Sequence, residues 1–96
     1  MEIIHLEKDN FNDLIKDKIL VDFFANWCGP CKMLAPELEK ADGSIKVLKV
    51  DVDEFEDLAR EYGVMSIPTL ILFENGKPVK QNVGFIDKKK IEEFIK

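Results

Sequence analysis

One segment constrains this chain more than any other: an apolar run at residues 19–25, interrupted only by Asp22, that leads directly to the chain's two cysteines, Cys28 and Cys31. A run that is apolar at both alternating positions is typical of a strand covered on both faces. The positions that follow fall at helical spacing: Cys31, Leu34, Ala35 and Leu38. The segment therefore predicts a buried strand that turns at once into a helix, with both thiols at the turn.

The rest of the chain alternates strand and helix patterns. Strands are predicted at residues 3–6, 19–25, 45–52, 69–73 and 79–85. Helices are predicted at residues 9–16, from the cysteines to the turn at 42–44, at 55–62, and after Asp87. Because Asn75-Gly76 is a hairpin dipeptide, the last two strands should be antiparallel. The order βαβαβαββα predicts an α/β fold: a mixed, mainly parallel sheet flanked by helices, formed by residues 1–96 as a single domain.

Composition narrows the classes of function. The net charge of -5 argues against general nucleic-acid binding. No apolar stretch approaches the roughly 20 residues that a membrane helix needs, and no basic segment precedes a long apolar run as in a secretory signal. We therefore expect a cytoplasmic protein with no membrane association. In the cytosol a close cysteine pair is more often catalytic or metal-binding than a structural disulfide.

The cysteine pair has three possible roles. A zinc site needs four ligands, and the chain offers only these two thiols and one distant histidine, His5. A structural disulfide across so short a loop would add little stability, because the entropic benefit grows with loop length. The pattern favours the third role, a redox dithiol that cycles between two thiols and a disulfide, and no metal site is expected.

The positions of the two thiols indicate different tasks. Cys28 follows a strand and begins a helix, where free backbone N–H groups and the helix dipole stabilise a thiolate. Cys31 starts the inward-facing stripe of the helix and should be less accessible. We therefore expect Cys28 to attack a partner disulfide and Cys31 to resolve the mixed disulfide. Gly29 and Pro30 shape the turn, and proline suits the first turn of a helix.

Asp22 allows two interpretations. It shares a strand face with Leu20 and Phe24, so it should be buried. A buried carboxyl group with few partners has a raised pKa and can exchange protons near neutrality. Alternatively, it is an aspartate at a strand edge or one that backbone donors satisfy. The residues alone leave both interpretations open.

Three segments together resemble the thioredoxin family: "VDFFANWCGPCK" with the following "MLAP", then "GVMSIPTLILFENGK", and "VGF" near the end. The resemblance covers nearly the whole chain, in the family's order. It implies the thioredoxin fold and a monomeric protein-disulfide reductase that contributes to cell redox homeostasis. It implies no bound cofactor beyond the redox-active Cys28–Cys31 disulfide. The implied partners are a thioredoxin reductase and disulfide-containing protein substrates.

The resemblance also assigns roles to residues that spacing alone does not. It implies that Asp22 is the buried proton-transfer group beneath Cys31 and that Lys49 neighbours it. It implies a cis peptide bond before Pro68, next to the disulfide. A surface around the exposed sulfur is expected to bind substrates, and it comprises Trp27, Gly29, Pro30, Ser66, Ile67, Pro68, Val83 and Gly84.

The residues leave two other functions open. Gly29-Pro30 resembles the reducing members of the family, whereas oxidases and isomerases of this fold usually carry a histidine between the cysteines, which makes the disulfide more oxidising. A thiol oxidase or isomerase is thus the first alternative. The second is a binding module in which the dithiol is dispensable.

Overall fold

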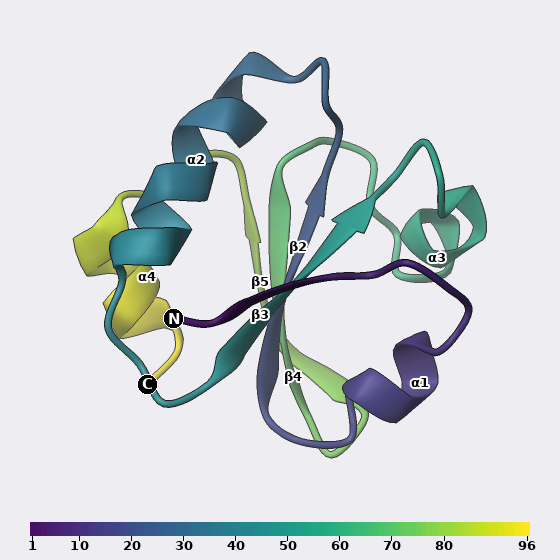
Figure 1. Cartoon of the computed structure of the whole chain (residues 1–96), viewed down its shortest axis with the longest axis horizontal. Helices are drawn as coiled ribbons and strands as arrows, with labels where there is room; N and C mark the ends of the chain where they lie inside the picture. Colours follow the sequence, from purple (N-terminus) through teal and green to yellow (C-terminus); the bar gives the residue numbers. More distant parts are fainter.

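The computed structural model describes all 96 residues and shows a central sheet with two helices on each face (Figure 1). Helices α2 and α4 cover one face, and α1 and α3 cover the other. The elements in chain order are β1 (Ile3–His5), α1 (Phe11–Leu14), β2 (Ile19–Phe24), α2 (Gly29–Lys40), β3 (Lys46–Asp51), α3 (Glu56–Glu61), β4 (Thr69–Glu74), β5 (Lys77–Val83) and α4 (Lys88–Phe94). This order confirms the predicted βαβαβαββα arrangement.

The sheet has five strands in the order β1-β3-β2-β4-β5. Strands β1, β3 and β2 are parallel, β4 runs antiparallel to β2, and β5 returns antiparallel to β4. The sheet is therefore mixed, with its antiparallel hairpin at one edge. Strand β2, which leads to the cysteines, lies at the centre.

The burial of β2 explains its apolar run. Leu20 packs in a cluster with residues of α2 and α4, while Val21 and Phe23 pack in the cluster on the α1 and α3 side. All three side chains are fully buried. Since successive side chains of a strand point to opposite faces, a strand between two helix layers must be apolar at nearly every position. Asp22 is the exception, and it too is fully buried.

Strand β5 and helix α1 depart most from their predicted bounds. Strand β5 was expected at residues 79–85 but spans Lys77–Val83. Asn75 and Gly76 both have positive φ (54° and 80°), so the turn needs only these two residues and β5 starts directly after it. The strand ends at Val83 because Gly84 adopts a φ of 97°, which a strand does not allow. Helix α1 is also shorter than expected, although Phe11 and Ile15 are buried as its pattern indicates.

Helix α2 follows its predicted pattern. Cys31, Leu34 and Leu38 form its buried stripe. Pro30 occupies the first turn, and the helix continues through Pro36 to Lys40. Among the helices of this fold, none has the length and apolar character that a bilayer-spanning segment requires.

Candidate active site

The turn between β2 and α2 holds the cysteines in place. Cys28 is the N-cap of α2, with the extended backbone (φ −86°, ψ 114°) that this position requires. Cys31 lies one helical turn later, with its Cα 5.2 Å from that of Cys28, and the two sulfur atoms form a disulfide. This distance is within the usual range for disulfides. The fold therefore allows the pair to open and close without moving either element far.

The surroundings of Cys28 suit a sulfur anion. In the disulfide form, the backbone N–H of Cys31 donates a hydrogen bond to Cys28 Sγ at 3.2 Å. The same sulfur lies 3.8 Å from the carbonyl oxygen of Ile67. Once the bond is reduced, this N–H and the positive end of the α2 dipole would stabilise a Cys28 thiolate.

Exposure alone does not distinguish the two thiols. In the disulfide form Cys28 is 5% exposed and Cys31 is 3% exposed. Their neighbours differ more. Cys28 faces Ile67 in the loop before β4, whereas Cys31 lines a small hollow of about 130 Å³ that Lys49 also lines.

Asp22 lies at the centre of the sheet, where β2 pairs on both sides, and its side chain is fully buried. Neither carboxylate oxygen accepts a hydrogen bond from the protein. The structure therefore excludes the strand-edge and backbone-satisfied interpretations. Loss of hydration raises the pKa of Asp22 from 3.8 to about 6, an effect that the charge of Lys49 only partly offsets.

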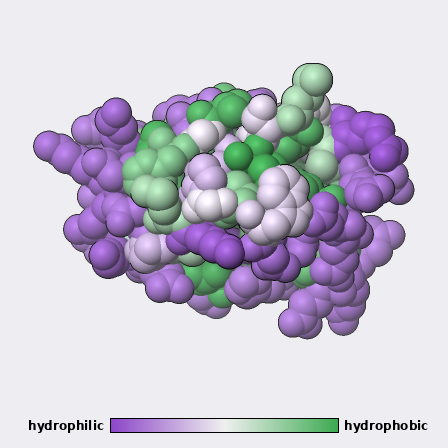
Figure 2. All heavy atoms as spheres, turned by 90° about the horizontal axis from the view of Figure 1, so that it is seen from above, coloured by the Kyte–Doolittle hydropathy of each residue, from purple (hydrophilic) through white to green (hydrophobic).

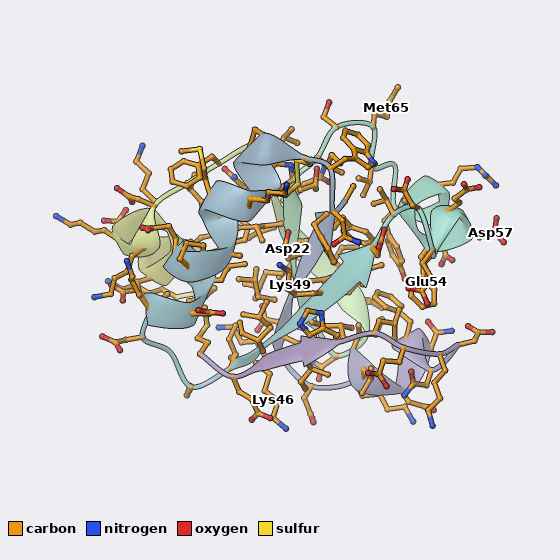
Figure 3. The ribbon with its side chains drawn as sticks, turned by 45° about the horizontal axis from the view of Figure 1, so that its top comes forward. Asp22, Lys46, Lys49, Glu54, Asp57 and Met65 are labelled. Carbon is orange, nitrogen blue, oxygen red and sulfur yellow. A yellow bond between two sulfur atoms is a disulfide. The ribbon has the colours of Figure 1, made fainter.

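Lys49 is the charged group nearest to Asp22 (Figure 3). The two residues are partners in the parallel β2–β3 ladder, and Lys49 Nζ lies 3.7 Å from Asp22 Oδ2. That separation is an ion pair rather than a hydrogen bond. The ammonium group also lies over the Phe24 ring, 4.4 Å from its centroid. With 11% of its side chain exposed, Lys49 connects the buried carboxylate with the surface.

The segments expected to bind substrates meet around the disulfide. The Ile67–Pro68 bond is cis, as the resemblance implies. The N–H of Gly84 donates to the carbonyl oxygen of Pro68 at 2.8 Å, which joins the segment after β5 to the loop before β4. Apolar side chains gather at the end of the molecule where α2 begins (Figure 2). The exposed large apolar side chains of this end include Trp27 and Val83 as well as Met65, which is 96% exposed.

One contact of the site could not be found from the sequence. The indole N–H of Trp27 donates to Asp53 Oδ2 at 2.8 Å. Asp53 lies after β3, and its spacing along the chain does not relate it to Trp27. The bond fixes the orientation of an exposed ring beside Cys28.

A redox disulfide at a helix N-terminus, next to a cis-proline loop and at the end of a strand that carries a buried carboxylate, defines a small dithiol–disulfide oxidoreductase. The thioredoxin family model matches residues 2–96. A thioredoxin of Staphylococcus saprophyticus is 49% identical over 99% of this chain and 96% of its own, and one of Staphylococcus aureus is 45% identical over the same shares. The chain belongs to the thioredoxin family.

Solved structures agree with this assignment. A mutant thioredoxin from Halobacterium salinarum superposes with a TM-score of 0.91 at 38% identity, covering 98% of this chain and 88% of that one. A reduced thioredoxin pre-protein from Schistosoma mansoni gives 0.82 at 40% identity, covering 99% and 96%. The family uses a redox-active disulfide and has, in general, a reductase and disulfide-containing proteins as partners.

Proposed function

We propose that this chain is a reductant of protein disulfides in which Cys28 attacks, Cys31 resolves and Asp22 accepts the proton of Cys31. The observation that carries the proposal is the Cys28–Cys31 disulfide at the N-terminus of α2, with a donor aimed at Cys28 Sγ. No histidine or other cation stands between the two cysteines. The thiolate is therefore not overstabilised, and the dithiol remains a good electron donor.

The reaction transfers two electrons in two steps. The Cys28 thiolate attacks one sulfur of the partner disulfide, the partner's S–S bond breaks, and the released partner thiolate takes up a proton. Cys31 then gives its proton to Asp22, and its sulfur attacks Cys28 Sγ within the mixed disulfide. The second partner thiolate leaves and takes up a proton from solvent, so the partner ends as a dithiol and the chain as a disulfide. Lys49 stabilises the carboxylate form of Asp22 between cycles.

A thioredoxin reductase would return the two electrons, and we propose that the chain works as a cytoplasmic monomer. Its redox group is the disulfide itself. The two sulfurs react in a recess beside exposed Trp27, Met65 and Val83, which suits an extended segment of another protein.

A double variant tests the proposed activity against a pure binding role. Cys28→Ser with Cys31→Ser should leave the fold intact and give no acceleration of the reduction of insulin by dithiothreitol, measured as turbidity. The wild-type chain should accelerate the same reaction. Equal acceleration by both proteins would contradict the proposal.

Val83 offers a prediction for the substrate-binding surface. It is 59% exposed at the end of β5 and pairs with Thr69, next to Pro68. Val83→Ser should raise KM for a protein disulfide about 2- to 10-fold, since a lost apolar contact costs about 1 kcal/mol, and leave the rate with a small aromatic disulfide unchanged. Val79→Ser is the matched control, because Val79 is 48% exposed on the same strand but farther from the site. Equal KM values for both variants would contradict the prediction.

A further inference from the structure

The buried position of Asp22 creates a problem of proton release. Once it has taken a proton from Cys31, the carboxyl group must lose it before the next cycle. Its side chain has no exposed surface and no hydrogen-bond partner. Lys49 lies between Asp22 and the surface, because its ammonium nitrogen is 3.7 Å from Asp22 Oδ2 and 11% of its side chain is exposed.

Lys49 borders three hollows of the molecular surface. The smallest, about 130 Å³, is also lined by Cys31. The other two, about 490 and 250 Å³, are on the β1 side and are both lined by His5. Lys49 thus stands between the resolving thiol and the two hollows that share His5. Each hollow is large enough for water molecules, which can carry a proton between fixed groups.

The sheet register aligns the same residues. His5 is the ladder partner of Lys49 in β1–β3, and Lys49 is the ladder partner of Asp22 in β3–β2. Because side chains at paired positions project from the same face of a sheet, Asp22, Lys49 and His5 form one row from the centre of the sheet to its edge. His5 is exposed at the end of this row and is the only imidazole of the chain.

We propose that His5 receives the proton released from Asp22, through water beside Lys49, and passes it to solvent. The inference rests on the proposed role of Asp22 as proton acceptor and adds the exit route. His5 touches neither sulfur and acts through Lys49 and water as a positioning residue.

The other charged groups around this route are carboxylates. Glu7, Asp51 and Glu54 line the larger hollow with His5, and Glu39 lines the other. Imidazole is the usual proton shuttle among protein side chains, because its two ring nitrogens can accept and donate a proton. Imidazole is therefore the group of this row suited to collect and release the proton in each cycle. An imidazolium form would also repel Lys49, and the test must separate this electrostatic effect from proton transfer.

Stopped-flow kinetics over successive turnovers can test the route, because the proton of Asp22 leaves only after the first resolving step. Limiting protein is mixed with excess protein disulfide and dithiothreitol in weak buffer near pH 6.5, and its redox state is followed by the fluorescence of Trp27, the single tryptophan. His5→Gln should leave the first turnover unchanged and slow the step between turnovers by roughly 3- to 10-fold, and tens of millimolar free imidazole should restore the rate of that step, because the added base replaces the missing proton carrier. His5→Lys, which places at this position a positive charge that cannot exchange a proton near neutrality, should show the same loss and the same rescue.

Glu7→Gln is the matched control, since it changes an exposed charge of the same hollow and should neither slow the step nor respond to imidazole. A rate for His5→Gln equal to that of the wild type, or a loss that imidazole does not relieve, would overturn the proposal. Asp22→Asn in the same assay identifies which idea fails. If Asp22→Asn is not slowed, both the proton-acceptor role of Asp22 and the route through His5 are wrong. If Asp22→Asn is slowed while His5→Gln is not, only the route is wrong.

Discussion

Cys28→Ser is expected to reduce the catalysed reduction of a protein disulfide by about 10³-fold or more, because it removes the attacking sulfur. A serine hydroxyl at the N-terminus of α2 stays protonated near neutrality and does not attack disulfides. The fold should survive, since serine is also a good N-cap and Cys28 holds that position. Turnover is measured with insulin and dithiothreitol, and far-ultraviolet circular dichroism checks the fold.

Cys31→Ser should fail at a different step. Cys28 can still attack, but no second thiol resolves the mixed disulfide, so a covalent complex with the partner accumulates. Mass spectrometry under non-reducing conditions should show this adduct for Cys31→Ser and none for Cys28→Ser. The reverse pattern, with the adduct on Cys31, would show that the roles of the two thiols are exchanged.

Asp22→Asn should make the protein more stable at neutral pH while making it a slower enzyme. The folded-state pKa of Asp22 is raised from 3.8 to about 6 by burial. Between these pH values the folded chain holds a proton that the unfolded chain releases, so stability falls as pH rises through this window and stays lower above it. Above this window, the ionised carboxylate lowers the free energy of unfolding by about 3 kcal/mol. Asn carries no charge, so the variant should regain about 1–3 kcal/mol of this free energy of unfolding at pH 8 and almost nothing near pH 4.

Urea unfolding of the oxidised protein at the two pH values measures this effect. Asp13→Asn is the control, because Asp13 is exposed in a surface pair with Lys16 and should change stability little at either pH. The same Asp22→Asn protein should resolve the mixed disulfide about 10- to 100-fold more slowly at pH 7, since it cannot accept the proton of Cys31. A destabilised variant at pH 8 would contradict the account of a buried carboxylate that lacks hydrogen bonds.

Much of the fold follows from local patterns. The apolar run of β2 is typical of a strand covered on both faces, and the Asn75-Gly76 turn predicted the antiparallel hairpin. The C-terminal end of β5 was harder to predict, because it depends on the positive φ that Gly84 adopts, and nothing adjacent in the sequence indicates this.

The candidate site also combines features that the sequence could predict with features that depend on tertiary structure. Cys28, Cys31 and the turn between them are contiguous, so their arrangement could be predicted from a short segment. The pairing of Asp22 with Lys49 depends on the register of two strands that are distant in sequence, and only the family resemblance suggested it. The bond from Trp27 to Asp53 and the alignment of His5 with Lys49 depend equally on tertiary structure, and spacing along the chain carried no signal for either.

The equilibrium reduction potential of the Cys28–Cys31 couple tests the central claim most directly. The protein is titrated in dithiothreitol or glutathione redox buffers, and the oxidised fraction is read from Trp27 fluorescence. A disulfide reductant should give a value near the roughly -270 mV of thioredoxin itself. A value in the range of about -180 to -120 mV, where isomerases and oxidases lie, would contradict the account and assign the chain to disulfide formation or isomerisation.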